Sequence, residues 1–236
     1  MTTNDSRTIP DAEPLAAATD LATAMRDLIE TAVTTTVPAA EVRAAAELVR
    51  QITERLAVAR RPVEQLSALD DLASGRRVFN MVSGSGSPLA PPLVLRREPG
   101  GLVGETILGV AYEGPPSYVH GGMSALLMDQ VLGDTAGAAG VWGMTVHLEL
   151  DYRGPLPIGE RLVLRGRVAE SEGRKSLIVG TIARAEDPDD LLVEARGLFV
   201  KPRPERLEAI FGRITDAAGE HRTPDRPSDA TAVPED

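Results

Sequence analysis

Four consecutive segments in the second half of the chain alternate between apolar and polar residues, and no other feature limits the fold as strongly. They span residues 145–153, 161–171, 176–185 and 191–200. β-branched residues are frequent in them, and short turn signals separate them. A period of two with β-branched residues predicts β-strands. Strands joined by such short connections pair antiparallel, so we expect an antiparallel sheet.

A single helix is predicted ahead of these strands, from Gly121 to about Ala138. Its apolar side carries Met123, Leu126, Leu127, Val131 and Leu132. Two further strands are predicted before the helix, at 93–97 and 102–112, with a turn between them. The order of strands, one long helix and four more strands favours an α+β fold in which an antiparallel sheet curls around a central helix.

The composition divides the chain into four parts. Residues 1–12 are polar and are expected to be disordered. Residues 13–75 form a predicted helical N-terminal extension, and residues 76–212 form the main domain. Residues 213–236 contain few large apolar side chains, so we expect a disordered tail.

Three helices are predicted within the N-terminal extension. Apolar residues recur at intervals of three and four from Leu15 to Ala32, which indicates an amphipathic helix. A second helix is expected to have Pro38 in its first turn and an apolar stripe that runs as far as Leu56. A third, short helix is expected between Pro62 and Gly75. These helices could act as an interaction module.

Charge and composition narrow the classes of function. The net charge is −10, which argues against a general nucleic-acid binder, because such a protein needs a basic surface. The chain has no cysteine, so a disulfide, a thiol nucleophile and a zinc–thiolate site are excluded. No segment approaches the roughly 20 apolar residues of a membrane span. The start of the chain lacks the features of a signal peptide, and we expect a soluble cytoplasmic protein.

The segment that carries chemistry surrounds the start of the predicted long helix. Gly121 and Gly122 lead into this helix, so the backbone can approach a ligand closely and its N–H groups point outward. The positive end of a helix can hold a developing oxyanion. Asp129 then lies within an otherwise apolar stretch of the helix. Burying a carboxylate in that position costs free energy unless it has a charged or hydrogen-bonding partner or takes part in the function.

Each of these residues also has an ordinary structural interpretation. The two glycines can form a simple strand-to-helix turn, and His120 can be a packing or hydrogen-bonding residue. Asp129 can face solvent on a partly exposed helix. The pattern as a whole is more informative than any of its members.

The spacing between Gly121 and Asp129 adds a constraint on assembly. Eight residues at about 1.5 Å each separate them by roughly 12 Å along the helix. A nucleophile and an oxyanion donor must both lie within about 3.5 Å of one carbonyl group. If both residues are catalytic, two subunits must meet, with Gly121 from one and Asp129 from the other. We therefore expect a homo-oligomer, either a dimer or a dimer of dimers.

These motifs resemble the hotdog-fold acyl-CoA thioesterases of the phenylacetate-pathway (PaaI-type) superfamily. The resemblance rests on His120-Gly121-Gly122, on Asp129 and Thr145, and on the segment 151–159 with its Tyr-x-x-Pro-x-x-x-Gly pattern. It covers about residues 93–203, roughly half of the chain. It implies a hotdog fold and hydrolysis of acyl-CoA to a free acid and CoA. It implies no metal and no cofactor, since CoA is part of the substrate.

The resemblance also implies roles for single residues. Asp129 matches the carboxylate that attacks the thioester or activates water. Gly121 matches the backbone donor to the carbonyl oxygen, and His120 helps to shape that turn. Thr145 lies where relatives carry a Ser or Thr that orients the lytic water.

Four residues are expected to contact the substrate. Gly122 lies in the glycine turn, where the backbone can approach a ligand. Tyr152, Arg174 and Lys175 lie in regions that look like those contacting CoA. Cationic side chains suit its phosphates. Arg174 and Lys175 can equally be a solvated hairpin turn.

The chain departs from the family pattern at Gly114. Many relatives carry an Asn six residues before the His of the glycine turn, where it polarises the carbonyl or positions water. Here Gly114 takes that place and two prolines follow it. The subgroup that relies on Thr145 fits this sequence better.

Two other functions remain open on the same fold. The first is a non-catalytic acyl-CoA-binding or regulatory protein, which would tolerate loss of Asp129. The second is a hydratase or dehydratase of acyl thioesters, which needs a His paired with an acid, with His120 and His147 as candidates. The spacing from the glycines to Asp129 favours hydrolysis.

Overall fold

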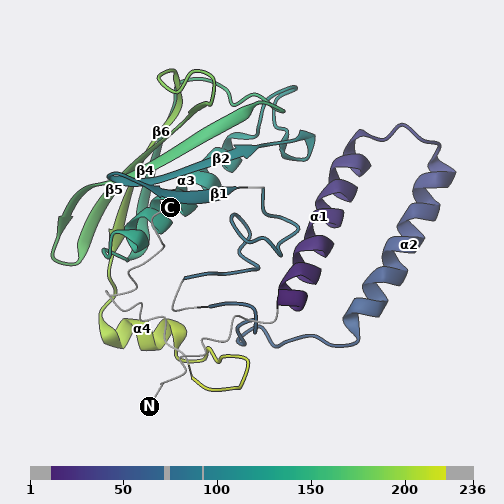
Figure 1. The fold of residues 1–236 in the computed structure, drawn as a ribbon, viewed down its shortest axis with the longest axis horizontal. Coiled ribbons are helices and arrows are strands. Elements are labelled where there is room, and N and C mark those ends of the chain that lie inside the picture. Colours follow the sequence, from purple (N-terminus) through teal and green to yellow (C-terminus); the bar gives the residue numbers. More distant parts are fainter. Residues whose placement is uncertain (1–11, 72–74, 92, 222–236) are drawn as a thin grey trace, which may run out of the picture.

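The computed structural model describes residues 12–71, 75–91 and 93–221 (Figure 1). The helices are α1 (Ala12–Thr34), α2 (Ala39–Ala57), η1 (Val110–Tyr112, a 3₁₀ turn), α3 (Gly121–Ala138) and α4 (Pro204–Phe211). The strands are β1 (Val94–Glu98), β2 (Gly101–Ile107), β3 (Met144–Tyr152), β4 (Arg161–Glu172), β5 (Lys175–Arg184) and β6 (Leu191–Val200). Disorder was expected for residues 1–12, but Ala12 begins α1, and residues 1–11 lie outside the described residues.

The six strands form one antiparallel sheet, which confirms the predicted sheet. Their order is β1-β2-β4-β5-β6-β3, so β1 and β3 lie at its two edges. The predicted strand at 102–112 was too long, because β2 ends at Ile107. Ile107 pairs with Arg161, the first residue of β4, so the chain beyond Ile107 has no strand beside it on that side. Residues 110–112 instead turn into η1.

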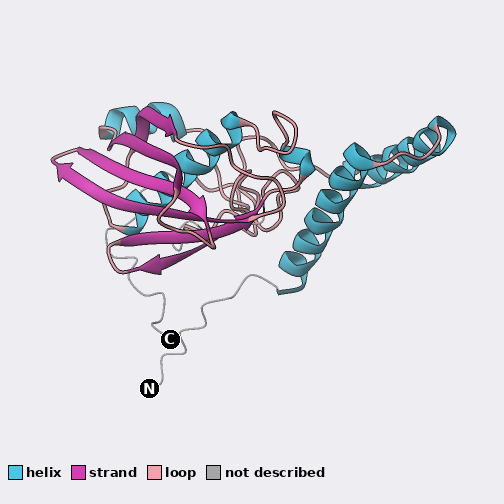
Figure 2. Ribbon diagram, turned by 90° about the horizontal axis from the view of Figure 1, so that it is seen from above, coloured by secondary structure: helices cyan, strands magenta, loops and turns pink. Residues whose placement is uncertain are grey.

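α3 lies against one face of the sheet, as predicted, and the sheet curls around it (Figures 1 and 2). Its fully buried side chains include Leu127, Met128, Val131 and Leu132. At 100° per residue these four residues lie within about 140° of the helix circumference, so α3 buries one broad face against the sheet.

Small residues on the sheet make room for the helix. Gly166 of β4 pairs with Gly180 of β5, which pairs with Ala195 of β6. A Cβ atom on Gly166 would lie 2.3 Å from Oγ1 of Thr135 on α3. A Cβ atom on Gly180 would lie 2.8 Å from a methyl carbon of Leu132. Without side chains at these positions, the helix backbone can approach the sheet closely.

The N-terminal extension contains the first two predicted helices. α1 lies against the main domain, where Ala22 is buried and Nη1 of Arg26 donates to the carbonyl of Ser87 over 2.9 Å. α2 contains no buried residue. Figure 2 shows α1 and α2 as an arm that projects from the rest of the molecule. None of the helices in the described part of the chain combines the length and the apolar character needed to cross a membrane.

The third predicted helix, at 62–75, does not form in its described part, residues 62–71 and 75. Backbone groups there bond to the end of the chain: the N–H of Leu66 donates to the carbonyl of Thr215 over 2.8 Å, and the N–H of Thr215 donates to Glu64 over 3.0 Å. A helix would need those groups for its own bonds. The disorder predicted from residue 213 is therefore wrong for 213–221, and residues 222–236 lie outside the description.

α4 was not predicted. It begins with Pro204 in its first turn, a position that suits proline because no helical N–H is needed there. It is eight residues long and contains no buried residue, so its apolar side gave only a weak signal.

Candidate active site

The turn before α3 is held by His120. Its ring nitrogen Nδ1 accepts from the N–H of Gly122 over 2.9 Å, which makes His120 the N-cap of the helix. Its backbone N–H donates to the carbonyl of Tyr112 over 2.9 Å. In this cap Nδ1 of the ring is the acceptor of the hydrogen bond. The N–H of Gly122 is thus engaged within the turn.

Gly121 keeps its backbone N–H open. No hydrogen bond from this group is found among the described residues. The carbonyl of Gly121 accepts from the hydroxyl of Tyr152 over 3.0 Å. A donor at the positive end of a helix suits a developing negative charge.

Tyr152, at the end of β3, therefore lies beside the glycine turn. A Cβ atom on Gly121 would lie 3.5 Å from its ring. The Tyr152 side chain remains 56% exposed, so one end of it holds the turn and the rest faces solvent. The sequence suggested a substrate contact here, and the structure adds a contact with Gly121.

Two of the predicted catalytic residues, Asp129 and Thr145, are in contact through their side chains. The hydroxyl of Thr145 donates to Oδ1 of Asp129 over 2.9 Å. Asp129 is half-buried on α3, next to the fully buried Met128, and Thr145 is exposed near the start of β3. One carboxylate oxygen is thus held by a neutral donor, and Oδ2 can accept a proton or act as a nucleophile.

The two halves of the candidate site lie at opposite ends of β3. Thr145 and Asp129 meet near its start, whereas Tyr152 and Gly121 meet at its end. On α3 itself, eight residues at about 1.5 Å each keep Gly121 and Asp129 roughly 12 Å apart. One protomer therefore does not bring its own Asp129 and Gly121 to the same carbonyl group.

Gly114 cannot be replaced by a larger residue without a shift in the backbone. A Cβ atom there would lie 2.6 Å from Cα of His120. The N–H of Gly114 donates to the carbonyl of Tyr118 over 2.9 Å, which closes the loop tightly. Within this loop Ser117 has a positive φ of 71°. The loop thus excludes a side-chain donor at the position where relatives carry Asn.

Arg174 and Lys175 lie at the turn between β4 and β5, and both are exposed. Nη1 of Arg174 donates to the carbonyl of Lys201 over 3.0 Å. Lys175 pairs with Val200 of β6, which in turn pairs with Met144 of β3. Both cations are therefore at the end of the sheet where Thr145 lies, two strands away from it.

His147 is not paired with His120 within the chain. His147 is exposed in the first half of β3, whereas His120 lies next to Gly121, which contacts Tyr152 at the strand's other end. Five residues of strand separate His147 from Tyr152, which is roughly 17 Å. No group of three His, Asp or Glu side chains suited to a metal ion is found among the described residues.

Glu30 belongs to the surroundings of the site, and sequence reasoning missed it. From α1, its Oε1 accepts from the N–H of Val110 over 2.8 Å and its Oε2 from the N–H of Ala111 over 3.0 Å. These residues begin η1, whose last residue, Tyr112, accepts from the backbone of His120. The extension is thus linked to the glycine turn through two contacts. A Glu on the polar side of a helix gives no local signal of such a contact.

Tyr112 packs against the main core between these two contacts. Burial raises the pKa of its phenol, while the charge of Arg26 lowers the pKa and that of Glu30 raises it. The hydroxyl group is therefore neutral at ordinary pH.

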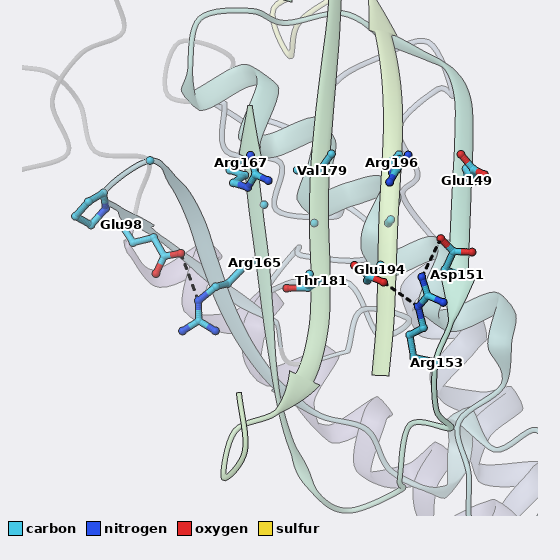
Figure 3. Close-up of a pocket in the computed structure, with 15 residues that line it drawn as sticks. Glu98, Glu149, Asp151, Arg153, Arg165, Arg167, Val179, Thr181, Glu194 and Arg196 are labelled. Carbon is cyan, nitrogen blue, oxygen red and sulfur yellow. Dashed lines mark hydrogen bonds and ion pairs between the residues drawn. The ribbon is translucent and has the colours of Figure 1, made fainter. Parts of the chain in front are cut away.

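A separate groove lies on the sheet face opposite α3 (Figure 3). Its lining is charged: Nε of Arg153 contacts Glu194 over 2.8 Å, and Arg165 contacts Glu98 over 3.5 Å. None of the predicted site residues lines it. The groove is therefore distinct from the candidate active site.

Comparisons with known proteins relate this part of the chain to thioesterases. The thioesterase superfamily pattern matches residues 117–192, which include the glycine turn, Asp129, Thr145 and Tyr152. The acyl-coenzyme A thioesterase THEM4 of Xenopus laevis is 38% identical over 98 residues, which is 41% of this chain and 43% of that protein. THEM4 of Mus musculus is 36% identical over 98 residues, 42% of each. The chain thus spans less than half the length of these relatives.

A solved structure matches far more of the chain. It is the crystal structure of a thioesterase superfamily protein, 34% identical, with a TM-score of 0.67. The match covers 78% of this chain and 94% of that one. Residues 76–212 are 137 of the 236 residues, so the match extends beyond the main domain. It confirms the predicted hotdog fold, and the chain belongs to the thioesterase superfamily.

Proposed function

We propose that this protein hydrolyses acyl-CoA thioesters to the free acid and CoA. The observation that carries the proposal is the 2.9 Å hydrogen bond from Thr145 to Asp129, which gives a half-buried carboxylate on α3 a fixed orientation. The relatives named as acyl-coenzyme A thioesterases support the choice of substrate class. We keep the PaaI-type subgroup and the cytoplasmic location as predictions, which substrate profiling and cell fractionation would test.

Asp129 acts in its ionised form. As a general base it takes a proton from water through Oδ2, while the water oxygen adds to the thioester carbonyl carbon. The tetrahedral intermediate then collapses, the C–S bond breaks, and the proton passes to the leaving thiolate to give CoA. If Asp129 attacks the carbonyl directly, a mixed anhydride forms and water hydrolyses it in a second step. Both routes consume one water for each thioester.

The oxyanion of the intermediate binds the open N–H of Gly121 from a second subunit. His120 and Tyr152 hold that N–H in place through their bonds to Gly122 and Gly121. A fixed donor at a helix start stabilises the developing charge without reorganisation during the reaction.

The edge strand β3 supports this composite site. It pairs only with β6 among the described strands, and most of its side chains are exposed. Antiparallel pairing of β3 with its copy would place the start of one strand beside the end of the other. Thr145 and Asp129 of one protomer would then lie near the glycine turn of the partner. The proposed active unit is therefore a homodimer or a dimer of dimers.

Arg174 and Lys175 are proposed to bind the phosphates of CoA. Both are exposed, and they lie at the same end of the sheet as Thr145. Arg174 uses one nitrogen for the carbonyl of Lys201, so other guanidinium donors remain for a phosphate.

The test is hydrolysis of a series of CoA thioesters followed by detection of the free thiol. The protein has no cysteine, so it contributes no thiol background. We expect Asp129→Asn to lower kcat by about 10²–10⁴-fold, the usual contribution of a general base. Glu186→Gln, which removes an exposed carboxylate from the turn between β5 and β6, is the control and should leave the rate unchanged. Equal rates for wild type and Asp129→Asn would refute the proposal.

Gly114 favours one alternative, a protein that binds acyl-CoA without hydrolysing it. The loop excludes a side chain that could polarise the carbonyl from this position. Calorimetric titration with acyl-CoA separates the two functions, since tight binding without thiol release would establish the binding protein.

A further inference from the structure

The two N-terminal helices carry many large apolar side chains that remain exposed. Those of α2 are Val42, Leu48, Val49, Ile52 and Leu56, and those of α1 are Leu21, Met25, Leu28, Ile29 and Val33. Each is between 37% and 60% exposed, because α1 and α2 make few contacts with each other. We call these residues the arm face. Monomeric proteins rarely leave so many large apolar side chains of one segment in water, so the arm face is expected to have a partner.

α2 has the repeat of a helix that packs against another helix. Val42, Val49 and Leu56 are seven residues apart, and Ala45 and Ile52 fall between them. This is the heptad pattern in which two positions of every seven face a partner helix. α2 is 19 residues long and none of them is buried. A helix of this length gains most of its stability from packing, which the described part of the chain does not supply.

The charges of α2 indicate what kind of partner fits. It carries three acidic and three basic residues, Glu41, Glu47, Glu54, Arg43, Arg50 and Arg55, so its net charge is zero. A helix that lies on an anionic membrane has a polar face rich in Lys and Arg, which α2 lacks. Balanced charges suit a partner with the same pattern.

We propose that the arm face binds the arm face of a second copy of this chain, with the two α2 helices antiparallel and Val49 at their crossing. Glu41, Leu48 and Arg55 recur at intervals of seven and therefore lie on one flank of the apolar stripe. In an antiparallel pair, Glu41 of each copy lies beside the partner's Arg55, and the two Leu48 side chains meet between them. A parallel pair would form neither ion pair.

The proposed interface uses none of the residues assigned to the thioesterase reaction. The arm face consists of residues of α1 and α2, whereas Asp129 and Thr145 belong to α3 and β3. The interface can therefore be tested without an assay of activity.

The absence of natural cysteines allows a direct test with single cysteines in the full-length protein. Val49→Cys should form a disulfide-linked dimer rapidly under mild oxidation, because an antiparallel pair brings position 49 next to its own copy. Gln51→Cys is the matched control, since Gln51 lies about half a turn around the same helix and faces away from the stripe. We expect the Val49→Cys protein to link at least tenfold faster than the Gln51→Cys protein.

The direction of the helices is tested with Val42→Cys and Leu56→Cys. Neither protein alone should link, whereas an equimolar mixture should form the mixed disulfide. The thiol introduced at position 49 should also react more slowly with a polar maleimide than the thiol at position 51, and urea should abolish this difference.

Equal linking rates at positions 49 and 51 would overturn the proposal. This holds even if the thiol at position 49 reacts slowly with the maleimide, because a thiol that is covered but does not link must be covered by something other than a second copy of α2. Linking of Val42→Cys and Leu56→Cys each to itself would overturn the antiparallel arrangement.

Discussion

α2 and α3 are helices of nearly equal length with opposite surroundings. α3 has 18 residues, of which seven are buried, whereas α2 has 19 residues and none is buried. α3 carries two charged residues, Asp129 and Asp134, and α2 carries six. A helix that is apolar on most sides has to be enclosed, whereas a helix with one apolar stripe needs only one packed surface.

The difference between the two helices shows when a charged residue is informative. A carboxylate is ordinary on α2, where charges cover the polar side. On the largely apolar α3, a carboxylate needs a hydrogen-bond partner or a role in catalysis to offset the cost of its burial. Asp129 accepts a hydrogen bond from the hydroxyl of Thr145. The same residue type therefore indicates a functional site in one helix and solvent exposure in the other.

The largest expected effect comes from removing a buried leucine of α3. Leu132→Ala should lower the free energy of unfolding by about 2–5 kcal/mol, because it leaves a cavity in the core. Leu48→Ala on α2, where the side chain is 60% exposed, should cost less than about 0.5 kcal/mol in dilute protein. Urea unfolding measures both. If both substitutions lowered the free energy of unfolding by similar amounts, the conclusion that α3 is packed in the core and α2 is not would be wrong.

A smaller effect is expected where the sheet makes room for α3. Gly166→Ala places a Cβ atom 2.3 Å from Oγ1 of Thr135, so it should destabilise the protein by about 1–3 kcal/mol. Gly133→Ala is the matched substitution on the helix itself, where the nearest contact, to the ring of Phe199, is an ordinary 3.7 Å. It should be neutral or stabilising by up to about 1 kcal/mol, because Ala favours helix. Thermal unfolding of both variants would show the opposite signs, and a stabilising Gly166→Ala would contradict the packing described.

Glu30 tests whether the extension affects the site, because its hydrogen bonds to Val110 and Ala111 connect α1 to the segment before the glycine turn. Glu30→Gln keeps one acceptor and loses the other, so we expect a loss of about 1 kcal/mol in stability. We also expect kcat to fall several-fold with little change in KM, since the glycine turn is loosened but the CoA contacts are not. Asp27→Asn, an exposed carboxylate on the same helix, should change neither. A rise in KM alone would argue against a positioning role for Glu30.

The smallest effect is expected at Tyr152. Tyr152→Phe removes one exposed hydrogen bond to the carbonyl of Gly121 and should cost about 0.5 kcal/mol or less. Turnover should fall a few-fold, because the oxyanion donor is held less firmly. Tyr118→Phe serves as the control, since no hydrogen bond from its hydroxyl is found among the described residues. Unchanged turnover in Tyr152→Phe would mean that the glycine turn holds its position without this contact.

Local patterns predicted the main elements well. The bounds of α3 and β6 agree with the prediction, because glycines or turn residues flank a clear period in both. The end of β2, the irregular course of residues 62–71 and the structure at 213–221 were missed. In each of these the outcome depends on a partner distant in the sequence, such as Arg161 for Ile107 and Thr215 for Leu66.

The sequence by itself determined α1, α2, α3 and the strands of the sheet, although not the end of β2 or the helix α4. It also marked Asp129 as a charged residue within an apolar helix. Only the tertiary structure decided that Thr145 donates to Asp129, that Gly114 has no room for a side chain, and that Glu30 reaches the backbone of Val110. Periodicity and turn residues act over a few neighbouring positions. The contacts that were missed join residues 16 to 80 positions apart in the sequence. Such residues come together only when the elements pack, above all when α3 packs against the sheet.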